Sequence, residues 1–138
     1  MKTRVMYSSR KKKLIAYAEA IGQECGCLVN DIPPAYPAQK ERLVVIAVSM
    51  KGVPSDTVRR FCSELNAQRT QNVVLLIDGP KNGTGEAALK TVLRDSGTNV
   101  IDDTYYVKCG LFGSKLSESE RASVVEWIRR IQNLISEK

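Results

Sequence analysis

The chain contains no histidine among its 138 residues. This absence excludes Ser-His and Cys-His nucleophilic catalysis, as well as metal sites built from imidazole ligands. Acid–base chemistry would have to use a carboxylate, lysine, tyrosine or cysteine instead. Aromatic residues make up only 6% of the sequence, so few side chains could stack on nucleic-acid bases. We therefore do not expect a nucleic-acid partner.

Long apolar runs are also missing. No segment approaches membrane-spanning length, and residues 1–6 lack the apolar region and cleavage site of a signal peptide. We therefore expect a cytoplasmic protein with no membrane partner. The composition, 43% hydrophobic and 26% charged, is that of an ordinary globular protein. Its length predicts a single domain over residues 1–138, large enough for a substantial core.

The chain contains four cysteines, and they do not form a recognisable metal site. Cys25 and Cys27 flank one glycine, which is not a CxxC pair, and Cys62 and Cys109 stand alone. No second pair or histidine is near enough to complete a zinc site. We expect all four to be reduced, small, buried apolar residues.

The net charge is +6, and part of the excess lies in one cluster, Arg10-Lys11-Lys12-Lys13. The cluster follows a short apolar strand and two serines, and it precedes a helix with an apolar face. A helix N-terminus attracts anions, so cations placed there oppose the dipole unless an anion neutralises them. The alternative is a solvated face whose side chains extend into water.

The rest of the chain alternates strand-like and helix-like segments. Residues 43–48, and residues 73–77 within the expected strand 72–77, are continuously apolar, as expected for central parallel strands covered on both faces. This alternation predicts an α/β fold with a doubly wound parallel sheet and helices on both faces. The expected strands are 3–8, 27–32, 43–48, 72–77 and 99–108, the last at an edge. The expected helices are 12–24, one opened by Pro54, 86–95, and one capped by Ser117 and Glu120, with Trp127 in the core.

In such a sheet, ligands bind outside the carboxyl ends of the strands, so four loops should converge at one edge: residues 8–13, 49–54, 78–85 and 108–115. Most nucleotide-binding folds are excluded by these loops. Neither GxGxxG nor GxxxxGKS/T is present. A phosphoacceptor receiver would need acidic residues where the first and third strands end in serine.

What remains resembles the flavodoxin family over nearly the whole chain. Tyr7-Ser8-Ser9 resembles the opening of the flavodoxin phosphate loop, residues 48–56 resemble the second flavin loop of short flavodoxins, and residues 78–83 stand where the third would be. Residues 106–110, followed by Glu118, Arg121 and Trp127, are similar to the last strand and closing helix. The resemblance implies a five-stranded sheet in the order 2-1-3-4-5.

The resemblance also implies flavin mononucleotide (FMN) as cofactor and electron transfer to a partner reductase as function, with no catalytic residue and no metal. Because the chain is basic, that redox partner would present an acidic surface. The implied cofactor-binding residues are Ser8, Ser9, Arg10, Lys11, Lys12, Lys13, Ser49, Met50, Lys51, Gly52, Asp78, Gly79, Pro80, Lys81, Asn82 and Gly83.

The chain departs from the family pattern at the ligand. Lys12, Lys13 and Leu14 stand where flavodoxins have Gly, Asn and Thr, and no aromatic residue occupies the second or third loop; the nearest are Tyr36 and Phe112. Two hypotheses therefore stay open. One is an FMN electron carrier. The other is a flavin-free module that uses its basic loops to bind an anionic ligand or an acidic protein.

Overall fold

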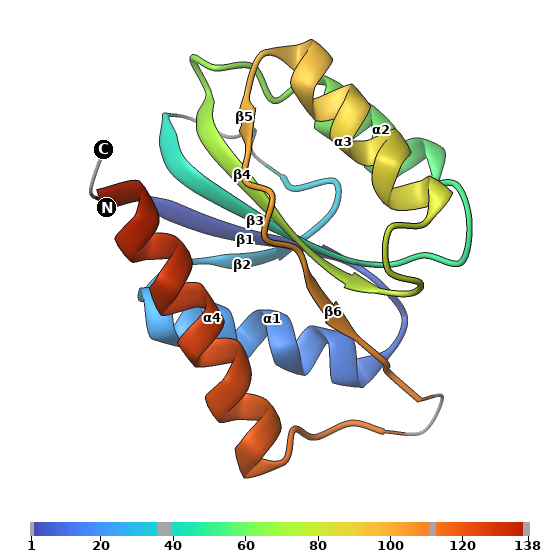
Figure 1. Cartoon of the computed structure of the whole chain (residues 1–138), viewed down its shortest axis with the longest axis vertical. Helices are drawn as coiled ribbons and strands as arrows, with labels where there is room; N and C mark the ends of the chain where they lie inside the picture. Colours follow the sequence, from blue (N-terminus) through green and yellow to red (C-terminus); the bar gives the residue numbers. More distant parts are fainter. Residues whose placement is uncertain (1, 36–39, 111–112, 137–138) are drawn as a thin grey trace.

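The computed structural model describes residues 2–35, 40–110 and 113–136 (Figure 1). Strands and helices alternate along the chain as the apolar pattern predicts. The elements are β1 Thr3–Ser8, α1 Lys12–Cys25, β2 Val29–Asp31, β3 Glu41–Ser49, α2 Asp56–Ser63, β4 Thr70–Asp78, α3 Thr84–Ser96, β5 Asn99–Val100, β6 Tyr105–Val107 and α4 Glu118–Ser136.

The strands form one parallel sheet in the order β2-β1-β3-β4-β5, and β6 also pairs with β4. The predicted α/β class and the order 2-1-3-4-5 are confirmed. The expected fifth strand is divided in two. Asp102 and Asp103 lie between β5 and β6, where their carboxylates pair with Lys90 and Arg130 instead of continuing the strand.

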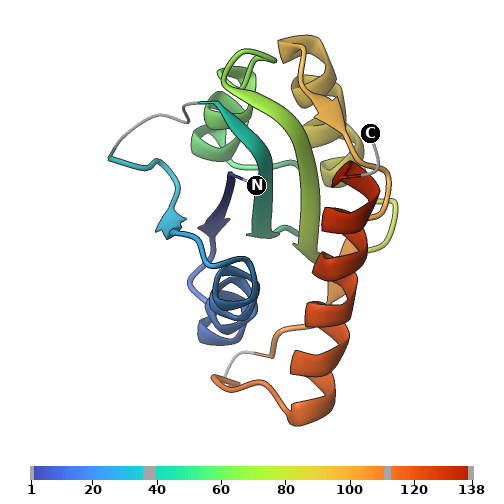
Figure 2. The same cartoon turned by 90° about the vertical axis from the view of Figure 1, so that its left-hand side faces the viewer.

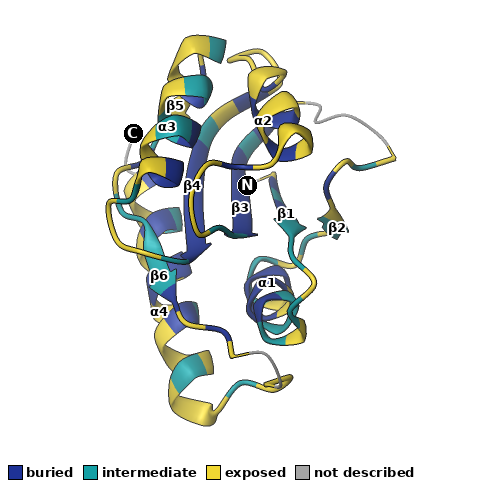
Figure 3. Ribbon diagram, turned by 90° about the vertical axis from the view of Figure 1, so that its right-hand side faces the viewer, coloured by how far each residue is buried: buried dark blue, intermediate teal, exposed yellow. Residues whose placement is uncertain are grey.

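Helices cover both faces of the sheet. Figures 1 and 2 show α1 and α4 on one face and α2 and α3 on the other. The alternating side chains of the central strands divide the core accordingly: Val45 and Val74 pack with α1 and α4, whereas Ile46 and Leu75 pack with α2 and α3. Figure 3 shows that β3 and β4 are buried over most of their length, which explains why residues 43–48 and 73–77 are apolar without interruption.

The helix ends follow local signals in the sequence. Gly26 and Gly97 close α1 and α3 in the left-handed conformation, with φ of 63° and 99°. The capping box of α4 is confirmed, because the Glu120 N–H donates to Ser117 Oγ at 3.1 Å and the Ser117 N–H donates to Glu120 Oε1 at 2.9 Å. Trp127 is a core residue with 2% exposure.

Three local expectations are wrong. Pro54 does not open α2, because Ser55 is the N-cap, accepts the Val58 N–H and starts the helix at Asp56. The second strand is only Val29–Asp31 rather than residues 27–32. Cys62 and Cys109 are buried as expected, but Cys25 and Cys27 are only partly buried, because the chain turns at the surface between them.

Candidate functional site at the carboxyl edge of the sheet

The parallel register brings the ends of four strands together. Ser8 of β1 pairs with Val48 of β3, Ser49 with Asp78 of β4, and Asp78 with Val107 of β6. The residues that follow these strand ends therefore meet at one edge, as the sequence predicts. We call this region the carboxyl edge.

A chain of polar side chains crosses the carboxyl edge. Ser9 Oγ lies 2.8 Å from Ser49 Oγ, and Ser49 Oγ donates to Asp78 Oδ2 at 2.9 Å. Ser9 Oγ also accepts the Lys11 N–H at 3.0 Å, which fixes the turn before α1. The first, second and third loops are thus tied to one another by side chains of the protein itself.

Asp78 is the centre of this network. Its Oδ2 accepts the ammonium of Lys11 at 2.8 Å, and its Oδ1 accepts the Cys109 N–H at 3.0 Å. Burial of Asp78, only 8% exposed, raises the pKa of its carboxyl, but the bonds from Lys11, Cys109 and Ser49 outweigh this and hold the pKa below its usual value. Asp78 is therefore a carboxylate at neutral pH, and Lys11 extends from the β1 end, past β3, to the β4 end to neutralise it.

The cations around the start of α1 differ in their contacts and exposure. Lys11 is the N-cap residue, with extended backbone and no side-chain cap on the helix. Lys13 turns towards α4 and pairs with Glu120 at 2.7 Å, which, together with the capping bonds from Ser117, lowers the pKa of Glu120 to about 2. Arg10 and Lys12 are exposed, and no ion pair joins either of them to a described residue.

The second and third loops lie against each other. The Met50 N–H donates to the Asp78 carbonyl at 3.0 Å. A Cβ atom on Gly79 would lie 2.1 Å from the Met50 carbonyl oxygen, and one on Gly85 would lie 2.0 Å from that of Gly52. The space lined by both loops is about 10 Å³, which is about the least room that one water molecule needs.

Glu86, which the sequence analysis did not single out, holds the third loop in place. Its carboxylate accepts the Asn82 N–H at 3.0 Å and the Tyr106 hydroxyl at 2.7 Å, and it pairs with Lys90 at 2.9 Å. Burial raises the pKa of Glu86, but these bonds outweigh it and lower the pKa below the usual value. A glutamate in a first helical turn is ordinary, so only its burial, at 3% exposure, shows its role.

The outer surface of the carboxyl edge is positively charged. All four loops contribute an exposed cation, and we call this set the basic rim: Arg10, Lys12, Lys51, Lys81 and Lys108. The Lys81 ammonium nitrogen, Nζ, lies 5.6 Å from the ring centroid of Tyr106. Within the described parts of the four loops, Asp78 is the one carboxylate, and Lys11 neutralises it.

The structure therefore separates the implied cofactor residues into groups. Ser9, Lys11, Ser49 and Asp78 are joined in one network, and the loops containing Met50 and Gly79 touch, whereas Lys13 points elsewhere. Tyr36 and Phe112 lie outside the described residues. No group of His, Cys, Asp or Glu residues in the described ranges could hold a metal ion.

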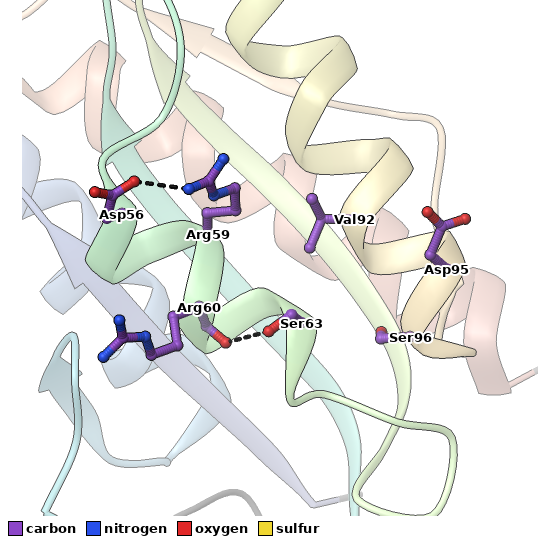
Figure 4. A pocket seen from close by; sticks show the side chains of 7 residues that line it. All are labelled: Asp56, Arg59, Arg60, Ser63, Val92, Asp95 and Ser96. Carbon is purple, nitrogen blue, oxygen red and sulfur yellow. Dashed lines mark hydrogen bonds and ion pairs between the residues drawn. The ribbon is translucent and has the colours of Figure 1, made fainter.

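Two larger hollows lie away from the carboxyl edge. A groove of about 600 Å³ lies between α2 and α3, and Val92 and Asp95 are among the residues that line it. Figure 4 shows these residues and the ion pair of Arg59 with Asp56, whose atoms lie 2.8 Å apart. A second hollow, of about 460 Å³, lies between the Pro33-Pro34 turn and α2. Neither contains a network comparable to the one around Asp78. Among the described helices, none is long and apolar enough to cross a membrane.

Comparison with known proteins identifies the fold. No protein-family model matches the sequence, and no curated protein matches it closely enough to count as a relative. Among solved structures, flavodoxin 1 from Bacillus cereus superposes with a TM-score of 0.70 at 13% identity, covering 96% of this chain and 98% of that one. A flavodoxin from the domain Archaea superposes with a TM-score of 0.68 at 14% identity, covering 99% of both chains.

A short-chain flavodoxin associated with a non-canonical PDU bacterial microcompartment gives a TM-score of 0.73 at 10% identity, covering 98% of this chain and 99% of that one. Sequence identities this low establish the architecture. Together with the parallel sheet order and the two helical layers, they show that this chain has a flavodoxin-like fold.

Proposed function

We propose that this chain is a binding module on a flavodoxin-like scaffold, and that its basic rim docks an acidic surface of a partner protein. The observation that carries the proposal is the arrangement at the carboxyl edge: four loops present exposed cations, while the one described carboxylate among them is already neutralised by Lys11. Such a one-signed surface raises the rate at which an acidic partner is encountered and fixes its orientation.

The loops at the flavodoxin position count against FMN as these residues stand. The isoalloxazine ring would have to lie between the second and third loops, but the loops are in backbone contact at Gly79 and Gly85, with about 10 Å³ between them. Lys11, a cation of the implied phosphate loop, is already bonded to Asp78 at 2.8 Å. Flexible lysines also bind a phosphate as point charges and do not replace a cradle of backbone N–H groups.

A second candidate function is the FMN electron carrier implied by the fold. The observation in its favour is the start of α1, where no side chain caps the helix and Ser8 and Ser9 stand next to it. An uncapped helix N-terminus offers backbone N–H groups to an anion. The flavin, when bound, would supply the redox chemistry.

The deciding experiment measures two ligands against the same variants. FMN is titrated into the purified protein and its fluorescence quenching followed, and binding of a labelled decaglutamate peptide is followed by anisotropy. The test variant is Lys51→Glu with Lys81→Glu, on the basic rim. The matched control is Arg60→Glu with Arg69→Glu, which makes the same charge change at exposed residues outside it.

Docking through the basic rim predicts no quenching of FMN, binding of the peptide, and loss of peptide binding in the rim variant but not in the control. Equal loss in both variants would show that only net charge matters and would refute the docking site. Stoichiometric FMN quenching that weakens when residues 11–13 are changed to alanine would instead establish the second candidate.

A further inference from the structure

The chain makes a tight turn between Cys25 and Cys27 at the end of α1. Cys25 is the last residue of the helix, and Gly26 follows in the left-handed conformation, with φ 63° and ψ 41°. The Cys27 N–H then donates back to the Gly22 carbonyl at 3.0 Å. This turn reverses the chain so that the two cysteines meet across a single glycine.

The two thiols interact directly. The contact with Cys25 lowers the pKa of Cys27, and the Val5 backbone N–H adds to this effect against the opposing effect of burial. The same contact, together with burial, raises the pKa of Cys25. Gln132 of α4 donates its Nε2 to Cys25 Sγ at 3.3 Å. The Cys25 thiol is therefore contacted from two sides, by Cys27 and by Gln132.

A disulfide between these residues is within reach of the backbone. A disulfide needs Cα atoms no more than about 7 Å apart. Two residues separated by one other cannot exceed about 7 Å even in a fully extended chain, and the left-handed turn at Gly26 brings them closer. The ring that would close is very small, so the disulfide would be strained and easily reduced again.

Cys27 is accessible, unlike the thiols in the core. It lines a hollow of about 380 Å³ at the surface, together with Glu19, Gly22, Gln23, Gly26 and Val29. Cys62 and Cys109 have exposures of 0% and 6%. The 14-residue helix α1, about 21 Å long, separates this pair from the basic rim, so the pair lies well away from that surface.

We infer that Cys25 and Cys27 form a redox-active dithiol that exchanges with a disulfide on a partner molecule. The Cys27 thiolate attacks one sulfur of the partner disulfide, forms a mixed disulfide, and releases the other partner sulfur as a thiolate. Cys25 then gives up its proton to the released partner thiolate and attacks the Cys27 sulfur, which releases the second partner sulfur as a thiolate that takes a proton from water. In this direction two electrons pass from the protein dithiol to the partner disulfide, which leaves as two thiols while a Cys25–Cys27 disulfide forms. Because that disulfide is strained, the reverse transfer, from a partner dithiol to the Cys25–Cys27 disulfide, is the favoured direction.

The experiment equilibrates the full-length protein with mixtures of reduced glutathione and glutathione disulfide, traps free thiols by alkylation, and locates the products by peptide mass spectrometry. In the wild-type protein we expect a reversible intramolecular disulfide at Cys25 and Cys27, with Cys62 and Cys109 remaining free. Cys25→Ser removes the resolving thiol, so we expect about tenfold more glutathione adduct at Cys27 than in the wild-type protein. Cys27→Ser should form neither product.

Three results would overturn the inference: both thiols remaining free in glutathione disulfide, a wild-type reaction that stops at the glutathione adduct, or disulfides that form only between two protein molecules. Because the wild-type protein alone gives the primary result, misfolding of a variant would not obscure it. The outcome does not depend on peptide docking at the basic rim.

Discussion

At the scale of single residues, the ion pair between Lys11 and Asp78 affects how the carboxyl edge would receive an anion. The two residues are far apart in the sequence, yet the lysine ammonium lies 2.8 Å from the carboxylate, which also accepts bonds from Ser49 and Cys109. An anion entering the carboxyl edge would compete with Asp78 for Lys11. The ion pair therefore acts against a phosphate ligand while preserving the positive charge of the surrounding rim.

Replacing Lys11 with methionine keeps the alkyl chain and removes the charge that balances Asp78. Because Asp78 is 8% exposed and keeps its bonds to Ser49 and Cys109, we expect a loss of about 1–2 kcal/mol in unfolding free energy at pH 7. Urea denaturation measures this loss. The exposed Lys12→Met is the matched control, with an expected change within about 0.5 kcal/mol; equal losses would mean that the ion pair contributes nothing specific.

The same ion pair predicts a dependence on pH. The pKa of Asp78 is lowered in the folded protein, so its contribution to stability is present above the ordinary pKa of 3.8 and is lost as pH falls through the lower folded value. We therefore expect the stability difference between the wild-type protein and Lys11→Met to be largest at neutral pH and to shrink below about pH 4. Denaturation at a series of pH values measures it, and a difference that grows on acidification would contradict the assignment.

The cap of α4 is a residue-scale feature that the sequence does predict. Ser117→Ala removes the acceptor of the Glu120 N–H, and we expect it to lower the unfolding free energy by about 0.5–2 kcal/mol. Thermal denaturation followed by circular dichroism measures the loss. Ser114→Ala, an exposed serine three residues earlier and outside the helix, should change little; a similar loss there would refute the capping role.

At the scale of elements, the contact between the second and third loops determines the shape of the carboxyl edge. The loops approach so closely that Gly79 and Gly85 leave no room for a Cβ atom. The bonds that Glu86 makes to Asn82 and Tyr106 then hold the third loop against β6. This part of the carboxyl edge is therefore a packed surface.

Gly85→Ala tests the loop contact. A methyl group there would overlap the Gly52 carbonyl oxygen, so we expect the loops to separate and the unfolding free energy to fall by about 1–3 kcal/mol. Gly52→Ala is the control from the other loop, because its Cβ would have no neighbour within 4 Å. Chemical-shift changes mapped by NMR should reach Met50 in the first variant only, and an unperturbed Met50 in Gly85→Ala would disprove the contact.

At the scale of the whole molecule, the net charge is +6, and the basic rim gathers exposed cations at one edge of the sheet. We expect the affinity for decaglutamate to fall steeply with salt, because the Debye length decreases from about 10 Å at 0.1 M to about 3 Å at 1 M. Anisotropy titrations at several salt concentrations measure the slope. The rim variant Lys51→Glu with Lys81→Glu should flatten it, whereas a salt-independent affinity would argue against electrostatic docking.

The sequence by itself determines the elements and the core of this protein. The uninterrupted apolar runs specify the central strands, Gly26 and Gly97 end their helices, and Ser117 caps α4, because each of these signals acts through neighbouring residues or through burial on both faces. Where a signal is weaker, sequence reasoning fails. Ser55 rather than Pro54 starts α2, and the fifth strand breaks at Asp102 and Asp103.

Only the tertiary structure decides what the carboxyl edge can hold. Three features join residues far apart in the chain: the bond from Lys11 to Asp78, the burial of Glu86 and the contact between the second and third loops. The charge and size of a residue do not by themselves reveal which distant residues it will contact. The partial burial of Cys25 and Cys27 likewise depends on the surface turn at Gly26. Local chemistry thus sets the scaffold, whereas the parallel register, by bringing distant strand ends together, sets the site.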